Sequence, residues 1–286
     1  MNGFRHSPLF GIVLIFALTW SVGLALAAQS RGLIPAIVPS AAGLLIGYLV
    51  VAAAIVATAL QDGWRGVRVL LLRFLVWRVS AVWYAVALLG FPLLYIAALA
   101  VWMLSGGPAP EFGSPPVTKF VPAGLSLLVV APAWLLYEIF TNGEEIGWRG
   151  YLLPRLQSRY SPLVATLIVA AVWAMWHSPK FLVVPATYDY PLWLWLVDIG
   201  AKAVLMTWLF NNTRGSLLLP TLFHASWNTA SLCLPILPTA QGDLGPFSVA
   251  VGFTAVAAIA VMVRDPQLGL RATERSSRPD QIAARA

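Results

Sequence analysis

Three short polar motifs interrupt apolar stretches of this chain, and their residue types are suited to chemistry. They are EEIGWRG, with Glu144, Glu145 and Arg149; WAMWHSPKF, with His177; and FHASWN, with His224 and Asn228. An ionisable side chain in hydrocarbon costs on the order of 2.5 to 3.5 kcal/mol at mid-helix, so it is rare there unless it serves a function. Each of these side chains is therefore a candidate for a site.

Helical spacing predicts which of these side chains face one another. Residues four apart lie on one face of a helix, so Glu145 can pair with Arg149, and His224 and Asn228 project to one side. Glu144 is turned by about 100° from Glu145 and lacks that cationic partner. A carboxylate without a cationic partner suits a general base that must later act as an acid.

Two imidazoles, a carboxylate and an amide at one site are compatible with three kinds of chemistry. In the hydrolysis of an amide, Glu144 and His177 would activate water and protonate the leaving nitrogen, while His224 and Asn228 would stabilise the oxyanion. Glu144, His177 and His224 would alternatively form a zinc site, although no HExxH helix supports one. A proton relay would use the same residue types but has no obvious need for Asn228.

The composition indicates the environment in which these motifs must work. Of 286 residues, 59% are apolar and only 10% are charged, whereas an ordinary soluble domain is about 25% charged. This composition excludes a soluble globular protein and a disordered chain. The single Cys233 excludes an intrachain disulfide, and the basic residues are spread between apolar segments, so we expect no nucleic-acid partner. The predicted fold is all-α, a polytopic membrane helix bundle with a buried polar site.

Eight apolar stretches are long enough to cross the ~30 Å hydrocarbon core with ~20 residues each. They are residues 8–28, 37–60, 79–104, 121–149, 163–184, 190–210, 216–237 and 244–263. The first also resembles a signal peptide, but its apolar core exceeds the usual ~7 to 15 residues, so we expect residues 1–28 to be retained as a helix. We expect residues 1–263 to form a single transmembrane domain and residues 264–286 to form a polar, disordered cytoplasmic tail.

The basic residues predict the orientation of the chain. With the N-terminus inside, most of the 18 lysines and arginines fall in the inner segments, including the clusters around Arg68, Arg155 and the C-terminal tail. The positive-inside rule therefore predicts a multi-pass protein of the plasma membrane with both termini in the cytoplasm.

A hairpin is predicted between the fourth and fifth stretches. Its tip is Tyr160-Ser161-Pro162, with Ser161 as the N-cap and Pro162 as the first residue of the next helix. Glu144 lies as far before Tyr160 as His177 lies after Ser161. If both arms are helical, Glu144 and His177 lie at the same depth.

Together the three motifs resemble those of a known family, the CPBP intramembrane glutamic endopeptidases, which includes CAAX-processing enzymes and bacteriocin-associated Abi proteins. They occur in the family's order: Glu-Glu-x-x-x-Arg as Glu144, Glu145 and Arg149, an aromatic-x-x-x-His as Trp173 and His177, and His-x-x-x-Asn as His224 and Asn228. The surrounding segments GWRGYLLPRL and NNTRGSLLLPTLFHASWNT resemble prokaryotic members. The similarity covers about residues 64–232. Trp173 departs from the family pattern, which more often has Phe.

The resemblance implies a role for each motif. It implies that Glu144 and His177 activate water, that His224 and Asn228 form the oxyanion hole, and that Glu145 and Arg149 support them. We expect no cofactor; a divalent metal such as zinc on Glu144, His177 and His224 is the alternative. For Glu145 and Arg149, an ion pair that only fixes helix packing is an equally strong reading.

Three further polar residues receive a structural interpretation. Glu138 lies seven residues before Glu145 on the same stripe, which suits a pocket-lining or structural carboxyl group. Asp198 and Lys202 lie four apart in the sixth stretch, where they are expected to neutralise one another.

The expected function is that of an intramembrane endopeptidase, which hydrolyses a peptide bond of a membrane-associated or CAAX-like substrate. Its expected partners are the lipid bilayer and a membrane-embedded or lipidated peptide or protein. The alternatives are a non-catalytic membrane immunity or scaffolding protein of the same fold and a proton-coupled transporter.

Overall fold

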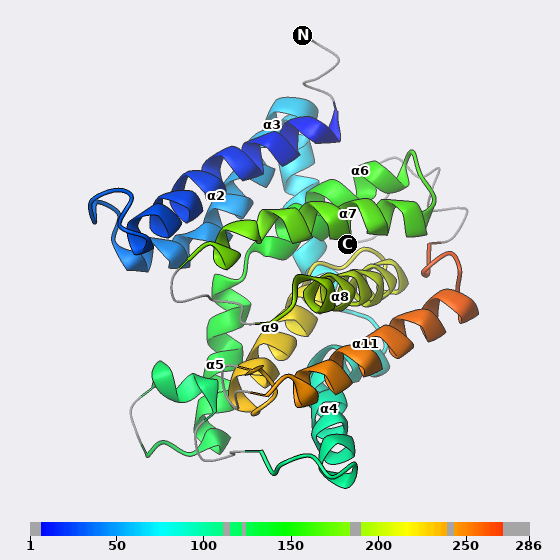
Figure 1. Cartoon of the computed structure of the whole chain (residues 1–286). Helices are drawn as coiled ribbons and strands as arrows, with labels where there is room; N and C mark the ends of the chain where they lie inside the picture. The colour runs from blue at the N-terminus through cyan, green and yellow to red at the C-terminus, as the bar shows by residue number, and fades with distance from the viewer. Residues whose placement is uncertain (1–6, 111–114, 122–123, 184–189, 239–242, 271–286) are drawn as a thin grey trace.

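The computed structural model describes residues 7–110, 115–121, 124–183, 190–238 and 243–270, and every regular element in these ranges is a helix (Figure 1). The longer helices are α2 (Pro8–Ser30), α3 (Ile46–Leu72), α4 (Ala81–Leu104), α5 (Leu127–Thr141), α7 (Pro162–Trp176), α8 (Leu192–Asn212), α9 (Leu218–Cys233) and α11 (Gly245–Arg264). The shorter ones are η1 (Ser40–Leu45), η2 (Arg73–Leu75), η3 (Pro116–Lys119), the π-helix η4 (Ile146–Leu152), α6 (Leu153–Gln157) and η5 (Ser178–Phe181).

Each of the eight predicted stretches overlaps one of the longer helices, and α3 extends 12 residues beyond the predicted end at residue 60. Within the described residues, five helices are long and apolar enough to cross a membrane, and α5 and α7 are apolar but only 15 residues long. The remaining helix, α9, has 16 residues and carries the third polar motif. The prediction of an all-helical, multi-pass membrane protein is confirmed, although α5, α7 and α9 are shorter than the stretches that predicted them by six residues or more.

The predicted stretch 121–149 contains a break that separates two helices. Helix α5 ends at Thr141, and Asn142 leaves the helical region with φ −87° and ψ 85°. The Asn142 side chain then accepts a hydrogen bond from the backbone N–H of Glu144, where the next helical segment begins and continues through η4 and α6. Asn-Gly is a turn-forming pair, since Asn bonds its own backbone and Gly adapts to the turn. The break places Glu144 and Glu145 at the start of a helix.

The hairpin tip forms as predicted. Ser161 caps α7 by accepting a hydrogen bond from the Val164 backbone N–H, and Pro162 is the first residue of the helix. Proline is favoured at this position because its missing N–H would have no partner in the first turn. The tip thus connects two antiparallel arms, 144–157 and α7 (Figure 1).

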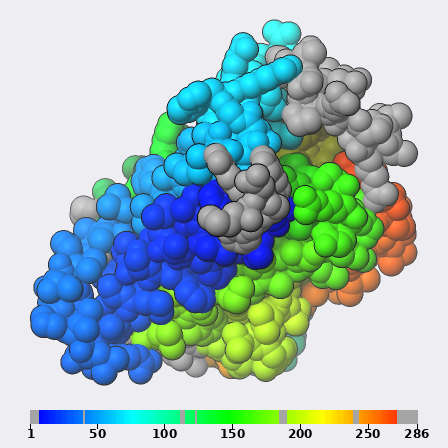
Figure 2. Space-filling model, turned by 90° about the horizontal axis from the view of Figure 1, so that it is seen from above, coloured from blue at the N-terminus to red at the C-terminus, as the bar shows by residue number. Residues whose placement is uncertain are grey.

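Helix α9 lies at the centre of the contacts that build the site. It packs against α4, α5 and α8, while α11 packs against α4 and α8. On another face α2 lies between α3 and α7 (Figure 2). There the Trp20 indole N–H donates to the carbonyl oxygen of Trp176 at 3.0 Å, which joins α2 to the end of α7.

Arginines gather where α3, the hairpin tip and the α8–α9 connection meet. The buried Arg73 donates to the Gly215 carbonyl oxygen at 3.2 Å, and its guanidinium lies over the Phe210 ring. Arg155 near the tip pairs with Asp62 of α3. After α11, Leu268 is fully buried and its carbonyl oxygen accepts from Asn211 of α8. The rest of the predicted tail, residues 271–286, lies outside the described residues.

Candidate active site

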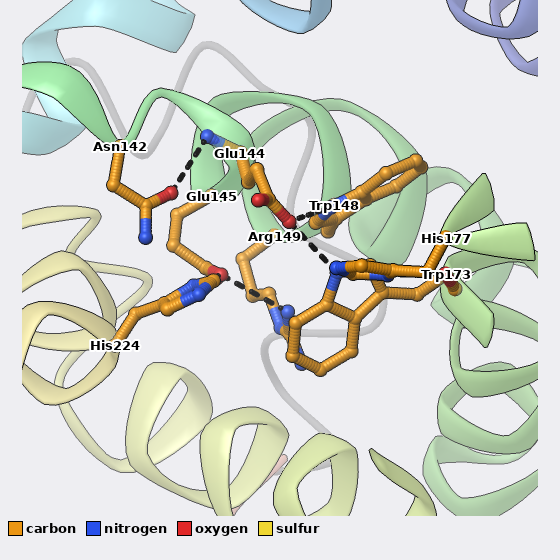
Figure 3. A network of polar contacts seen from close by, with 8 residues as sticks. All are labelled: Asn142, Glu144, Glu145, Trp148, Arg149, Trp173, His177 and His224. Carbon is orange, nitrogen blue, oxygen red and sulfur yellow. Dashed lines mark hydrogen bonds and ion pairs between the residues drawn. The ribbon is translucent and has the colours of Figure 1, made fainter. Parts of the chain in front are cut away.

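Glu145 joins two elements that are far apart in the sequence. Its Oε1 atom accepts a hydrogen bond from Arg149 Nη1 at 3.2 Å, within its own helix, and lies 2.8 Å from Nδ1 of His224 on α9 (Figure 3). Glu145 is fully buried and His224 is 3% exposed. The predicted pair with Arg149 is confirmed, and the contact with His224 ties the first polar motif to the third.

Arg149 is itself fully buried beside an aromatic ring. Its guanidinium carbon lies 4.8 Å from the centroid of the Trp173 ring, a distance at which a cation is attracted to the face of an indole. Within the described part of the chain, Nε and Nη2 of Arg149 and Oε2 of Glu145 have no hydrogen-bond partner. Arg149 therefore depends on Glu145 and Trp173 for its stabilisation.

Glu144 has different partners from its neighbour. Its Oε2 atom accepts hydrogen bonds from the indole N–H of Trp173 at 2.8 Å and of Trp148 at 3.3 Å (Figure 3). Both donors are neutral, so they orient the carboxylate without supplying a positive charge. The residue is half-buried, whereas Glu145 is fully buried.

His177 is the C-cap residue of α7. The α-helix ends here because Pro179 disfavours the helical conformation of the residue before it. The Nδ1 atom of His177 lies 2.9 Å from the carbonyl oxygen of Trp173, and its ring packs edge-on against Trp176. Trp173 thus contacts His177 through its backbone and Glu144 through its indole. The two arms of the hairpin are therefore joined at Trp173.

His224 and Asn228 project from one side of α9, as their spacing predicted. The imidazole of His224 stacks on Trp227 with centroids 4.8 Å apart and packs edge-on against Trp173. The Asn228 amide N–H donates to Glu138 Oε2 at 2.8 Å. Glu145 and Glu138 thus reach two successive turns of the same helix, α9, from the two sides of the break at Asn142.

Glu138 is bonded directly to a candidate site residue, Asn228, which the sequence did not indicate. The second oxygen of Glu138 accepts a hydrogen bond from the Trp134 indole at 3.2 Å, so α5 presents a fixed acceptor to Asn228. The prediction of one stripe with Glu145 assumed a continuous helix, which the break at Asn142 interrupts. The partner of Glu138 on α9 was not predicted, because the packing of α5 on α9 cannot be read from the spacing within either helix.

Trp173 lies at the centre of the cluster. Its ring contacts His177, His224 and Trp227 at centroid distances of 5.6 to 5.8 Å, in addition to Arg149 and Glu144. The structure therefore gathers Glu144, Arg149, His177 and His224 around one indole, and Glu145 joins this cluster through Arg149 and His224. Asn228 lies one turn further along α9. The sequence indicated an aromatic wall at position 173, but not these four contacts.

A metal site is not formed by these side chains as they stand. Across the described ranges, no three His, Cys, Asp or Glu side chains lie close enough to hold one ion. His224 binds Glu145, while Glu144 binds two indoles. The alternative zinc set of Glu144, His177 and His224 does not fit this arrangement.

An apolar cavity of about 530 Å³ lies next to the site. It is lined mainly by residues of α2 and by the end of α7, among them Trp20, Leu26, Ile46, Trp176 and Lys180. Trp176 belongs to both the cavity wall and the site, because its ring lines the cavity and also packs against His177 and Trp148. The cavity therefore adjoins the candidate active site through one tryptophan.

Comparison with known proteins agrees with the motifs. The model of the family described as "Type II CAAX prenyl endopeptidase Rce1-like" matches residues 116–230, a region shorter than the predicted core of 64–232 but containing every candidate site residue. The CAAX prenyl protease 2 of Methanococcus maripaludis is 33% identical over 115 residues, which make up 37% of this chain and 38% of that protein. Residues 116–230 are therefore similar to the Rce1-like type II CAAX prenyl endopeptidases, and the chain spans 38% of the length of the curated relative that it matches.

Proposed function

We propose that this chain is an intramembrane endopeptidase in which Glu144 and His177 activate water and His224 and Asn228 stabilise the oxyanion. The observation that carries the proposal is the difference between the bonding partners of the two adjacent carboxylates, Glu144 and Glu145. Glu145 is taken up by His224 and Arg149, whereas Glu144 accepts its two hydrogen bonds from neutral indoles through Oε2, and Lys180 acts on it only through its charge. Glu144 is thus the carboxylate that can accept a proton from water.

The step that this site would carry out is the addition of water to a peptide carbonyl. Glu144 takes one proton from the water, the hydroxide oxygen bonds to the carbonyl carbon, and the carbonyl π bond opens to an oxyanion. The protonated Glu144 then passes its proton to the leaving nitrogen as the C–N bond breaks. His177 lies beside Trp173 and Glu144 and assists this transfer.

The fixed contacts of His224 and Asn228 on one side of α9 support their proposed role as oxyanion donors. With Nδ1 of His224 directed at Glu145, Nε2 is the ring nitrogen left to face a substrate oxygen. Asn228 uses one amide N–H for Glu138 and keeps a second. Donors that are held in place before the reaction stabilise the transition state without having to reorganise.

The substrate that we propose is a membrane-associated, CAAX-like peptide or protein that carries a lipid. The similarity to a CAAX prenyl protease and the cavity of about 530 Å³ beside His177 support it, because the cavity is apolar and of a size usual for ligand sites. We place the chain in the plasma membrane with both termini in the cytoplasm. The gathering of Arg73, Arg155 and Arg214 at one end of the bundle supports this orientation.

The test is a comparison of new protein N-termini in cells expressing the wild type or Glu144→Gln at matched levels, by terminal-peptide mass spectrometry. Asp62→Asn is the matched control, because it neutralises an exposed carboxylate far along α3. New termini are expected with the wild type and the control but not with Glu144→Gln. Any peptide so identified is then cleaved in vitro with and without a chelator, and the rate is expected to be the same. Identical termini in all three strains would favour a non-catalytic partner of the same fold.

A further inference from the structure

Asp198 and Lys202 form a buried ion pair on α8. The two charged atoms lie 2.5 Å apart, and the residues are 5% and 1% exposed. Charged groups inside a membrane bundle are unfavourable even when paired. Mutual neutralisation explains why the pair is tolerated but not why α8 carries two charges at this depth.

The lysine makes another contact that neutralisation does not require. Its ammonium nitrogen lies 3.7 Å from the centroid of the Trp227 ring on α9 and 5.4 Å from that of Phe91 on α4. A cation at this distance from an indole face, away from water, gives the strong form of the cation–π interaction. The Asp198 carboxylate and the Trp227 ring therefore hold the ammonium group between α8 and α9.

Trp227 in turn supports His224. The indole and the imidazole are nearly parallel, with an angle of 17° between their planes. Trp227 also packs edge-on against Trp173, the indole at the centre of the cluster. Three side chains thus restrain His224: Glu145 holds Nδ1, Trp173 packs against the ring edge-on, and Trp227 stacks on its face and sets its tilt.

We propose that the Asp198–Lys202 pair is a positioning device for His224 that acts through Trp227. Lys202 holds the indole from α8, and the indole holds the imidazole at the angle from which Nε2 reaches the oxyanion. The proposed consequence for catalysis rests on the function proposed above. The positioning itself rests only on contacts among α8, α9 and the first polar motif.

The experiment removes both charges at once, so that no unpaired charge is left buried. In Asp198→Asn/Lys202→Met the side chains keep similar sizes, and the cation over Trp227 is lost. The matched control is Asp62→Asn/Arg155→Met, which removes the exposed ion pair near the hairpin tip. Both proteins are prepared in lipid nanodiscs with ¹⁵N-labelled histidine; the chain has only three histidines.

The direct readout is the imidazole NMR signal of His224, assigned by its disappearance in His224→Gln. A stacked indole shifts this signal, so a change in tilt moves it. We expect the double variant at α8 to move the His224 signal and leave that of His177 in place, and the control to move neither. Trp227→Leu is expected to move it as well, and adding the α8 double change to Trp227→Leu is expected to have no further effect.

The kinetic readout separates this inference from the proposed function. We expect the double variant at α8 to lower kcat about tenfold with KM unchanged, the size that loss of a desolvated cation–π contact supports. Lys202→Arg, which keeps a cation, is expected to retain most of the activity. An unmoved His224 signal together with unchanged kcat would overturn the positioning role. A moved signal in a protein whose wild type cleaves nothing would uphold the positioning and refute the proposed protease.

Discussion

Glu144 and Glu145 are adjacent in the sequence, yet their surroundings prepare them for different tasks. The ionic partners of Glu145 come from its own helix and from α9, so moving it would disturb both. The indole donors of Glu144 come from its own helix and from α7. One carboxylate is thereby built into the packing, and the other is oriented but keeps an oxygen for a reactant.

Arg149→Met is expected to lower the Tm strongly, because it leaves the Glu145 carboxylate buried beside His224 without its guanidinium partner. Breaking a buried ion pair by removing one member costs about 3 to 5 kcal/mol. The measurement is thermal unfolding of the purified protein in nanodiscs. The control is Glu145→Gln/Arg149→Met, which removes both charges and should be more stable than the single variant. A Tm equal to that of the wild type would contradict a packing role for the pair.

Glu138→Ala is expected to lower kcat about tenfold, the effect of one lost hydrogen bond, because Asn228 would no longer be held by α5. Glu138→Gln keeps an acceptor oxygen, and its kcat should remain close to that of the wild type.

Asn228→Ala removes the proposed oxyanion donor itself and should lower kcat by about 10²- to 10³-fold. These rates are compared on a single peptide substrate. Full activity in Glu138→Ala would mean that Asn228 keeps its orientation unaided.

At the residue scale, the sequence predicted the contacts that one helix determines and missed those that two helices make. Glu145 with Arg149 followed from their spacing, and so did the common face of His224 and Asn228. The contact between Glu145 and His224 joins residues 79 apart. It depends on how two helices cross, which no periodicity within either one encodes.

At the scale of elements, the break at Asn142 and Gly143 positions the two carboxylates, and the backbone of α3 passes close to it. A Cβ atom on Gly143 would overlap the Val51 side chain and lie 3.1 Å from the Gly47 carbonyl oxygen. A Cβ on Gly47 would in turn lie 3.0 Å from the Thr141 carbonyl oxygen. The absence of side chains on both glycines lets α3 support the segment from which Glu144 and Glu145 project.

Gly143→Ala is therefore expected to reduce both stability and kcat, since α3 or the break must move. Overpacking of this kind costs typically about 1 to 3 kcal/mol. Gly252→Ala on α11 is the matched control, because a Cβ there meets nothing within 4 Å. Thermal unfolding and peptide cleavage of the two variants are compared. A Gly143→Ala protein that behaves like Gly252→Ala would show that the crossing tolerates a side chain.

The elements themselves were partly predictable. The Ser161 cap and Pro162 signalled the hairpin tip, because both act through local backbone geometry. Asn142-Gly143 was an equally local signal for the break, but it stood inside a long apolar stretch and hydropathy does not register it. Nothing in the composition of Ile146–Leu152 distinguishes a π-helix from an α-helix.

At the scale of the whole molecule, the hydropathy pattern predicted the number and order of the longer helices. It did not predict that α5, α7 and α9, which carry or flank the three motifs, would be shorter than ordinary membrane spans. Apolar residues on either side of a functional helix extend the hydropathy signal beyond the helix end. The site therefore lies among helices that by themselves do not cover the ~30 Å of a bilayer.

The orientation is testable with the single native cysteine. In a Cys233→Ser background, Ser158→Cys near the hairpin tip and Ser105→Cys after α4 each introduce one exposed thiol. A membrane-impermeant maleimide is expected to label the Ser105→Cys protein in intact cells and the Ser158→Cys protein only in inverted vesicles. The reverse pattern would place both termini outside the cytoplasm. Cys233 itself is buried, so its removal should change little at the surface.

The π-helix at Ile146–Leu152 has a consequence for the length of this segment. A π-turn holds one more residue than an α-turn, so a chain shortened by one residue here would form an uninterrupted α-helix up to Gln157. The deleted residue is the one that the wider turn takes up, so the residues on either side keep their rotation and Glu144 and Glu145 still face α9. What the shortening removes is the wide turn itself, which contains Trp148 and Arg149. A single-residue deletion in this turn is therefore expected to preserve the direction of the two carboxylates and to displace Trp148 and Arg149, the side chains of this segment that bond to them.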